Sequence, residues 1–311
     1  MRLIKGIPDE PVFTKGCVLT IGNFDGVHLG HKVVIDKLVE RGRQLGLPVV
    51  IIIFEPQPLE YFKKTEAPPR LTHLREKVSH FAKLPVDDLI IVRFNKQLAD
   101  YDAEKFIGDI LINKLNVKHL VIGDDFRFGK ARLGDFNLLM EKGLEYGYQV
   151  EDTGSFQLAG QRVSSTLIRN ALMNGDLVLA EEMLGYSYAV CGKVIHGDKR
   201  GRTIGYPTAN IKMNRKNTPI NGVFAVTMTG INGLAHNGVA NVGVRPTVDG
   251  SNKVILETHL FDFDQDIYGQ PVTVHFKKKI RVERRFDTLQ ELKAQIEDDV
   301  AAAKNIFALQ Q

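Results

Sequence analysis

The sequence predicts an α/β domain with a parallel sheet, followed by a small antiparallel β domain and a C-terminal helix. Up to about residue 152, short segments that are apolar throughout alternate with segments whose apolar residues recur at helical spacing. This pattern is typical of a parallel sheet that is covered by helices on both faces. From 188 to 282 the chain changes to short strands separated by Gly, Pro and Asn turns, which indicates a small closed barrel.

In the first half, apolar strands are predicted at 16–21, 49–54, 89–94, 119–122 and 148–150, with amphipathic helices at 32–46, 72–84, 104–115 and 136–146. Thr72 is the expected N-cap of its helix because a threonine hydroxyl can accept a bond from a free amide of the first turn. Ligands of such sheets bind beyond the carboxyl ends of the strands. The turns that follow these strands are therefore the first places to look for chemistry.

A domain boundary is predicted between 184 and 185, which gives domains at 1–184 and 185–311. A short helix at 176–184 ends the helical pattern, and the periodicity changes after it. Alternation then predicts strands at 188–195, 223–228, 238–242, 254–260 and 272–276. A final helix, 289–309, has an apolar face and is expected to pack on the barrel, with Leu289, Leu292, Ile296, Val300 and Ala303 on that face.

Composition excludes several classes of protein. The chain has 311 residues, of which 43% are hydrophobic and 25% charged, as in ordinary soluble proteins. No apolar run approaches the roughly 18 residues that a membrane-spanning helix needs. Cys17 and Cys191 are far apart, which argues against a disulfide framework and for a reducing cytoplasm. The basic runs at 277–279 and 284–285 lack aromatic neighbours, so we expect a solvated face and no nucleic-acid partner.

The turn after the first predicted strand reads GNFDGVHLGH and spans 22–31. Gly22 and Gly26 allow tight backbone geometry and close approach of a ligand, and the helix that follows offers free amides to a phosphate. His28 and His31 are three apart on the first helical turn, so their rings point the same way. Together these features favour cleavage of a triphosphate. The alternative is an ordinary βα connection with a solvated histidine pair.

Two further turns of the first half carry polar side chains. The turn GDDFRFG, 123–129, contains Asp125, Phe126 and Arg127, which suit a planar polar ring. A charged loop held by two buried phenylalanines is the alternative there. The segment SSTLIR, 164–169, opens a helix, and its Arg169 lies one turn further along, where it can meet phosphate oxygens. By itself that segment is an ordinary helix cap.

The second half contains a stretch, 192–210, that is dense in glycine and cations. Glycines let backbone amides face phosphates, but the Gly-Lys-Ser/Thr order of a Walker loop is absent. Thr208 and Asn210 are two apart on an extended segment, so they share one side of it. Their neutral oxygens suit Mg²⁺ that also binds phosphates and water. The alternative is a glycine-rich barrel loop with a turn at Pro207.

On the strand at 254–260, alternation places Glu257 and His259 opposite the apolar Val254 and Leu256. A carboxylate on that face is a candidate base for a substrate hydroxyl. A cross-strand ion partner is an equally common reason for such a residue. The loop that follows combines Asp, Phe and Tyr side chains and can cover a flat ring.

The motifs GNFDGVHLGH, GDDFRFG and SSTLIR, followed by GYPTANI, NVGVRPT and ETHLFDFDQDIYG, resemble those of the bacterial bifunctional riboflavin kinase/FAD synthetase family over the whole chain. The resemblance implies a Rossmann-like nucleotidyltransferase domain and a six-stranded antiparallel riboflavin-kinase barrel with a C-terminal helix. It also implies two reactions. The barrel would move the γ-phosphate of ATP to riboflavin, and the first domain would move AMP from ATP to FMN, giving FAD and pyrophosphate.

For the adenylyltransferase, the resemblance implies that His28 and His31 stabilise charge in the transition state. The implied ATP contacts in this domain are Gly22, Asn23, Phe24, Asp25, Gly26, His28, His31, Ser165, Thr166 and Arg169. The implied flavin contacts are Phe62, Asp125, Phe126 and Arg127. Phe62 lies in a stretch, 55–62, that resembles the family's FxPxPxxxF motif.

For the kinase, the resemblance implies that Glu257 is the base on the ribityl 5′-hydroxyl and that Thr208 and Asn210 hold Mg²⁺. The implied ATP contacts are Gly192, Lys193, Gly197, Lys199, Gly205, Pro207, Thr208 and Asn210. The implied flavin contacts are Arg245, Phe261, Asp264 and Tyr268. Val244 departs from the commoner form of the motif that contains Arg245, and we expect little effect from it.

Two alternatives compete with this interpretation. One is a nucleotidyltransferase for another phosphorylated acceptor, fused to a non-catalytic flavin-binding barrel. The other is a flavin carrier without activity. The expected partners are the small molecules riboflavin, FMN and ATP, with no nucleic acid and no membrane, in a monomer or weak homo-oligomer.

Overall fold

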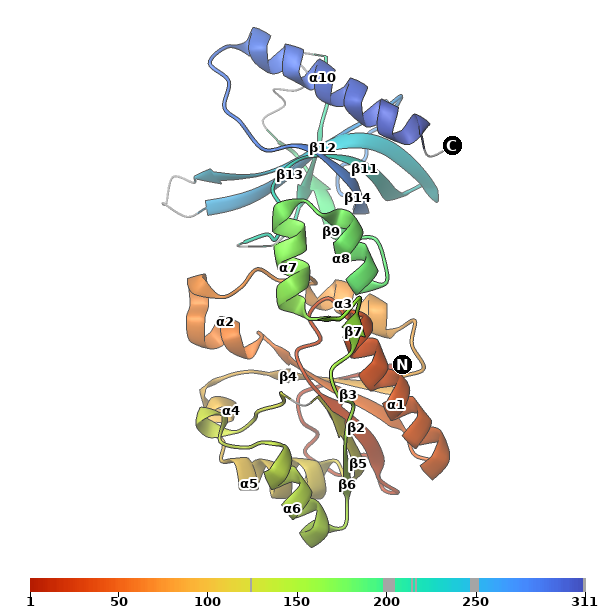
Figure 1. Cartoon of the computed structure of the whole chain (residues 1–311), viewed down its shortest axis with the longest axis vertical. Coiled ribbons are helices and arrows are strands. Elements are labelled where there is room, and N and C mark those ends of the chain that lie inside the picture. The colour runs from red at the N-terminus through yellow and green to blue at the C-terminus, as the bar shows by residue number, and fades with distance from the viewer. Residues whose placement is uncertain (124, 198–204, 214, 216, 247–251, 310–311) are drawn as a thin grey trace. The chain divides into compact units, whose positions relative to one another are not determined.

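The computed structural model describes all residues except 124, 198–204, 214, 216, 247–251 and 310–311 (Figure 1). The chain divides into two compact units. The first comprises Met1–Pro68 and Thr72–Ser164, and the second comprises Pro69–Leu71 and Ser165–Gln311. Helices α7 (Ser165–Asn174) and α8 (Leu177–Leu184) are thus grouped with the barrel. The domain boundary between 184 and 185 stays a prediction.

The first unit contains the predicted parallel sheet. Its strand order is β1-β4-β3-β2-β5-β6, and every neighbouring pair is parallel. The strands are β1 (Arg2–Lys5), β2 (Cys17–Ile21), β3 (Val49–Glu55), β4 (Asp88–Arg93), β5 (Val117–Ile122) and β6 (Gln149–Asp152). The chain moves outward from β2 to β3 and β4 and then returns to β5 on the other side of β2. The point where the order reverses is where open α/β sheets bind ligands.

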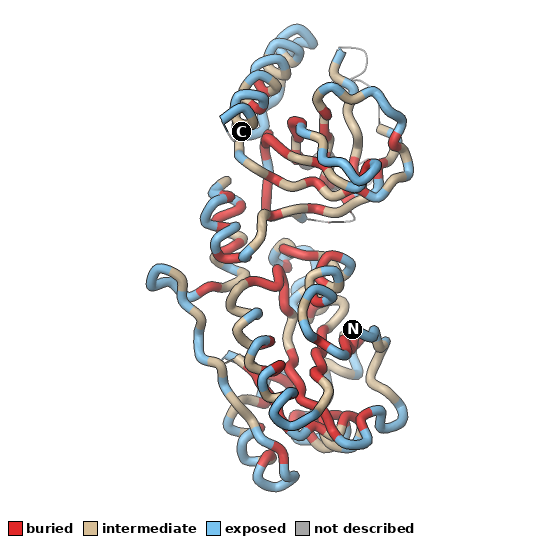
Figure 2. The backbone as a smooth tube through the Cα atoms, turned by 90° about the vertical axis from the view of Figure 1, so that its right-hand side faces the viewer, coloured by how far each residue is buried: buried red, intermediate tan, exposed pale blue. Residues whose placement is uncertain are grey.

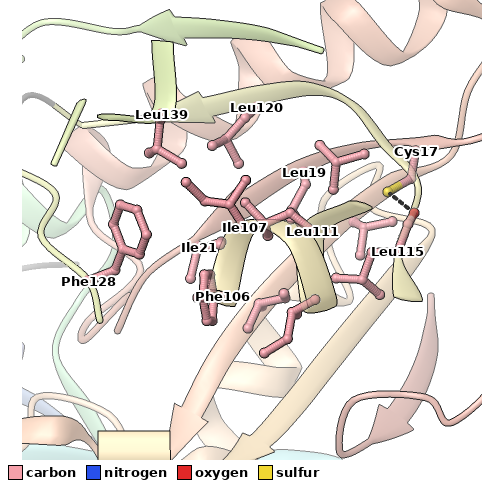
Figure 3. Close-up of a cluster of buried hydrophobic side chains, with 14 of the residues drawn as sticks. Cys17, Leu19, Ile21, Phe106, Ile107, Leu111, Leu115, Leu120, Phe128 and Leu139 are labelled. Atoms are coloured by element: carbon pink, nitrogen blue, oxygen red, sulfur yellow. Dashed lines mark hydrogen bonds between the residues drawn. The ribbon is translucent and has the colours of Figure 1, made fainter. Parts of the chain in front are cut away.

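Helices cover both faces of this sheet. The side chains of β2 alternate between two hydrophobic clusters, one on each face. Leu19 and Ile21 face the cluster built with the π-helix Phe106–Lys114 and α6 (Phe136–Tyr146). Figure 3 shows Leu19, Ile107 and Leu111 of this cluster together, with the Cys17 thiol donating to the Leu115 carbonyl at 3.3 Å. Val18 faces the opposite cluster, with α1 (Leu29–Leu45) and α3 (Leu74–Phe81). Strand β2 is buried over its whole length, and Figure 2 shows buried backbone running through the interior of the first unit.

The remaining elements of the first unit are short. They are α2 (Pro58–Lys63), the 3₁₀ turns Lys64–Glu66 and Lys130–Arg132, α4 (Lys96–Ala99), α5 (Ala103–Lys105), and the hairpin of β7 (Gln157–Leu158) and β8 (Gln161–Arg162). Strand β1 was not predicted, because its four residues are mostly exposed and contain no apolar run.

The second unit contains the expected six-stranded antiparallel barrel, closed in the order β10-β13-β12-β11-β14-β9. Its strands are β9 (Ala189–Ile195), β10 (Ala209–Lys212), β11 (Gly222–Ile231), β12 (Leu234–Pro246), β13 (Asn252–Leu260) and β14 (Pro271–Arg281). Periodicity missed β10, because only one of its four side chains is buried. Without β10 the barrel would not close.

Helix α10 (Leu289–Ala308) packs on the barrel as predicted. Its Val300, Ala303, Ile306 and Phe307 meet Val223, Ala225 and Val239. The prediction was wrong for Leu289, which is 68% exposed, because the first turn of the helix extends past the packed face. No helix among the described residues has the length and apolarity to cross a membrane.

Candidate active sites

The turn between β2 and α1 has an unusual backbone. Phe24 (φ 47°), Gly26 (φ 87°) and Val27 (φ 38°) all lie in the left-handed region. Glycine adopts this region at no cost, whereas a β-branched residue such as Val27 does so rarely. A conformation of this kind persists only where surrounding contacts hold it, and it is concentrated at functional sites.

The two histidines of this turn lie face to face. Their ring centroids are 3.6 Å apart with an interplanar angle of 19°, which confirms that the rings point the same way. His28 is the N-cap of α1, one position before the helix, and its Nδ1 accepts a bond from the His31 amide at 3.3 Å. In the neutral ring that nitrogen carries no proton, so the proton of His28 is on Nε2.

His31 lies in buried surroundings that lower its pKa well below the usual value, and the neighbouring His28 and the positive charge of Lys77 lower it further. Its Nδ1 is buried and has no hydrogen-bond partner among the described residues. In the neutral ring, this unused Nδ1 can accept a hydrogen bond from a ligand or donate one to it. The ring does not have to lose a proton first.

We predict that the His31 ring stays neutral as the pH is lowered through the usual histidine pKa of about 6.5, because burial lowers its pKa well below that value. The unfolded chain binds a proton below that value and the folded chain does not. The free energy of unfolding is therefore not reduced by His31 above about pH 6.5. Below that pH it falls, because the unfolded chain gains a proton there. Ring proton shifts measured by NMR as the pH is lowered test the prediction, and a midpoint near the usual value would contradict it.

Asn23, Phe24 and Asp25 face inward more than the sequence suggested. Phe24 is 4% exposed, with its ring 5.0 Å from that of His31. The Asp25 carboxylate accepts bonds from the Thr72 amide at 3.0 Å and the Thr72 hydroxyl at 3.3 Å. Only Asn23 has an unused group, since its buried Oδ1 has no partner among the described residues.

The prediction that Thr72 caps α3 was wrong. The cap is His73, whose amide donates to the Glu76 carboxylate at 2.6 Å. The Thr72 hydroxyl instead accepts the Gly26 amide at 2.9 Å, which attaches the β2–α1 turn to the chain that leads into α3. This contact joins positions that are 46 residues apart, so no local pattern could have predicted it.

An aromatic cluster lies at the carboxyl ends of β3 and β4. Phe62, on α2, is 62% exposed, and its ring centroid is 5.3 Å from that of Tyr61 and 5.7 Å from that of Phe94. Phe94 also contacts Phe54 at 5.8 Å. Of these aromatic residues, only Phe62 was predicted as a flavin contact, and Tyr61 and Phe94 were not. The sequence does contain a signal for both residues. Phe94 directly follows β4, and Tyr61 is the neighbour of Phe62.

The turn that follows β5 is held by ion pairs and by the core. Asp125 pairs with Arg162 at 3.1 Å, and Arg127 pairs with Asp135 at 3.5 Å. Phe126 stacks on the buried Phe128 at 5.6 Å. These contacts describe a charged loop anchored by phenylalanines, the alternative that the sequence left open. Its position after β5, the neighbour of β2 at the point of reversal, keeps it beside the histidine turn.

Ser165, Thr166 and Arg169 lie in α7, in the second unit. Arg169 donates from Nε to the Pro69 carbonyl at 2.7 Å. That these residues contact the nucleotide of the first domain stays a prediction.

In the barrel, three polar residues form a row across neighbouring strands. Asn210 on β10 is paired with Glu257 on β13, and Glu257 is paired with Asn241 on β12. Directly opposite residues of antiparallel strands share one face. Val254 and Leu256 are buried whereas Glu257 is only partly buried, which confirms the predicted alternation. Asn241 was not predicted, and its buried Oδ1 has no partner among the described residues.

His259 holds the backbone just before Thr208. Its Nδ1 lies 2.9 Å from the Pro207 carbonyl, and it must be the donor because a carbonyl oxygen only accepts. Its ring also meets the Tyr206 ring edge-on at 5.3 Å. This contact fixes the extended segment that carries Thr208 and Asn210 against the strand that carries Glu257.

The glycines of the stretch 192–210 differ in their structural roles. A Cβ on Gly197 would lie 2.2 Å from the Asn210 amide nitrogen, so this glycine makes room for Asn210. A Cβ on Gly192 would lie 2.3 Å from Ile211, which makes Gly192 a packing residue between β9 and β10. Gly205 has a φ of 88° and open space around it. Lys193 is exposed on β9, and Lys199 lies outside the described residues.

The four predicted flavin contacts of the barrel have different surroundings. Phe261 packs against α10, with its ring 6.4 Å from Phe307 and 5.4 Å from the Lys304 ammonium. Tyr268 contacts the ring of His196 at 3.8 Å. Asp264 is exposed. The backbone of Arg245 belongs to β12, and its side chain lies outside the described residues.

Comparisons with known proteins match both halves of the chain. Residues 10–167 match the FAD synthetase family model, and residues 184–307 match the riboflavin kinase family model. Proteins named bifunctional riboflavin kinase/FMN adenylyltransferase are similar over the full length. The one from Escherichia coli K12 is 49% identical over 99% of both chains, and that of Haemophilus influenzae is 50% identical over 99% of both.

One solved structure is similar throughout. It is named a macrolide-efflux protein from Streptococcus pneumoniae, and it has a TM-score of 0.80 and 29% identity over 98% of this chain and 99% of its own.

Proposed function

Because the chain belongs to the bifunctional riboflavin kinase/FMN adenylyltransferase family and has the two activities that make FMN and FAD, we propose that each activity has its own site. Adenylyl transfer is assigned to the β2–α1 turn and phosphorylation of riboflavin to the row on β10 and β13. The observation that carries this assignment is the stacked His28–His31 pair at the start of a helix, separate from the Asn210–Glu257 pair of the barrel.

For adenylyl transfer, no protein nucleophile is required. An oxygen of the FMN phosphate attacks the α-phosphorus of ATP, the bond from that phosphorus to the bridging oxygen breaks, and pyrophosphate leaves. Negative charge builds up on the phosphate oxygens during this step. The Nε2–H of His28 and the free amides at the start of α1 are suited to stabilise it, and Asn23 offers a further polar group.

We assign the flavin ring to the aromatic cluster of Tyr61, Phe62 and Phe94. Offset and edge-on aromatic contacts bind a flat ring favourably, and the exposed Phe62 supplies a free face. Asp125 and Arg127 are the second choice, because both are engaged in ion pairs.

For the kinase, Glu257 takes the proton of the ribityl 5′-hydroxyl, whose oxygen then attacks the γ-phosphorus of ATP and releases ADP. The Thr208 hydroxyl and the Asn210 amide oxygen are neutral ligands on the same extended segment, and this donor set fits Mg²⁺ that keeps phosphate and water ligands. Bound there, Mg²⁺ would neutralise charge on the phosphates of ATP. His259 orients this segment through Pro207.

The direct test is to incubate the protein with riboflavin, ATP and Mg²⁺ and to separate the flavins by chromatography. We expect FMN first and then FAD, with release of pyrophosphate. Flavin binding without consumption of ATP would favour the carrier alternative. If only an acceptor other than FMN were adenylylated, the nucleotidyltransferase alternative would hold. Both cysteines are free thiols, which is consistent with a cytoplasmic location and a reducing medium for the assay.

A further inference from the structure

The segment from Thr72 to Phe81, which contains α3, contacts the β2–α1 turn at three places. Thr72 bonds Asp25 and Gly26, and Lys77 donates to the Asn23 carbonyl at 2.5 Å. At its end, Phe81 meets Phe24 edge-on at 5.6 Å. These contacts span the part of the turn with the rare positive φ angles. The segment thus has the position of a clamp on the turn that carries His28.

The Thr72 hydroxyl is used in two directions. It accepts from the Gly26 amide at 2.9 Å and lies 3.3 Å from Asp25 Oδ1, to which it donates. The Thr72 side chain is 3% exposed, so water does not replace these bonds. Removal of the hydroxyl would break both bonds and leave only the Thr72 amide as the link from Thr72 to Asp25. The loss of buried hydrogen bonds is costly.

Lys77 is a fully buried cation, with 0% exposure. Burying an ammonium group is expensive, and an apolar side chain of similar length would fill the same space at lower cost. The ammonium group donates to the Asn23 carbonyl, so the buried charge acts on the backbone of the β2–α1 turn. The same charge lowers the pKa of the His31 ring, so it acts on the histidine pair as well as on the backbone.

We propose that Thr72 and Lys77 are positioning residues for adenylyl transfer, which hold the strained turn between β2 and α1 so that His28 and the free amides of α1 meet the triphosphate. The inference rests on the assignment of adenylyl transfer to this turn. The residues act through the turn and are not themselves required to touch the reacting atoms.

Thr72→Val and Thr72→Ser form the first test. Valine keeps the shape of the side chain and removes the hydroxyl, whereas serine keeps the hydroxyl. We expect Thr72→Val to lower kcat for FAD formation from FMN by about 10- to 100-fold, the scale of loss caused by small misplacements of reacting groups. Thr72→Ser retains most of the rate. Riboflavin phosphorylation, measured in the same samples, stays unchanged in both variants.

Lys77→Met forms the second test, with Lys83→Met as its matched control. Lys83 is an exposed lysine just after the end of α3. We expect Lys77→Met to lower kcat for FAD formation and, in an NMR titration, to raise the pKa of His31, because a nearby positive charge has been removed. Lys83→Met changes neither. If Lys77→Met does not fold, the two Thr72 variants still decide.

The inference is overturned if Thr72→Val keeps full adenylyltransferase activity, if Thr72→Ser loses as much as Thr72→Val, or if phosphorylation falls in parallel. His28→Ala separates this inference from the assignment on which it rests. Loss of FAD formation in His28→Ala together with full activity in Thr72→Val refutes the clamp alone. Full FAD formation in His28→Ala refutes the assignment of the site.

Discussion

His28→Ala is expected to abolish FAD formation from FMN and ATP, while riboflavin is still converted to FMN. The substitution removes the Nε2–H that stabilises charge on the phosphates. Removal of a single donor of this kind costs about 10²- to 10³-fold in kcat. The His31 ring also loses its stacking partner at 3.6 Å. Chromatography of the flavins after separate incubations with riboflavin and with FMN measures both steps in one protein.

A control is needed because His28 is also the N-cap of α1. Asparagine is a good N-cap residue, so His28→Asn keeps the start of the helix but lacks the ring. We expect it to be as inactive in FAD formation as His28→Ala. Recovery of activity in His28→Asn would show that capping is the role of this residue. Equal loss of both steps in His28→Ala would contradict the division into two sites.

Most of the parallel sheet was predictable, because strands buried on both faces are continuous apolar runs. The run at 49–54, for example, appears as β3 with its first five residues buried. Strand β1 escaped prediction because an edge strand with an Arg2–Asp88 ion pair has no such run. The order of the strands, which places the histidine turn beside the turn after β5, depends on pairing that periodicity does not encode.

The candidate nucleotide site was only partly predictable from local pattern. The motif located the turn and the histidine pair, but it did not show that Asp25 and Phe24 face inward. The direction of a side chain in a turn is decided by its distant contacts, and here these come from Thr72 and Lys77, far along the chain. A lysine within an amphipathic helix normally indicates a solvated position, so its burial could not be foreseen.

In the barrel, alternation along one strand placed Glu257 correctly, because inward and outward positions follow from a period of two. The partners of Glu257 across the sheet required the register between strands. Asn241 lies opposite Glu257, yet nothing near Asn241 in the sequence indicates that pairing. The family resemblance implies that Phe261 contacts the flavin, and the structure packs its ring against Phe307 of α10. The flavin contact stays a prediction.

Glu257→Gln is expected to stop the conversion of riboflavin to FMN, while FMN that is supplied directly is still converted to FAD. Glutamine matches glutamate in shape and hydrogen-bonding length, but its amide does not accept a proton from the ribityl hydroxyl. Loss of a general base costs about 10²- to 10⁴-fold in rate. Glu297→Gln is the matched control, since Glu297 is exposed on α10 and should leave both steps unchanged.

Glu257 lies between Asn210 and Asn241 in the sheet. This position lets the Glu257→Gln variant distinguish proton transfer from a structural role of the side chain. An amide between two asparagines keeps the hydrogen-bonding character of the row, so the variant should fold and should still bind riboflavin, as flavin fluorescence would show. Retained binding with lost phosphorylation therefore identifies proton transfer as the role of the carboxylate. If Glu257→Gln phosphorylates riboflavin at the normal rate, the base lies elsewhere and Glu257 serves only as a cross-strand partner.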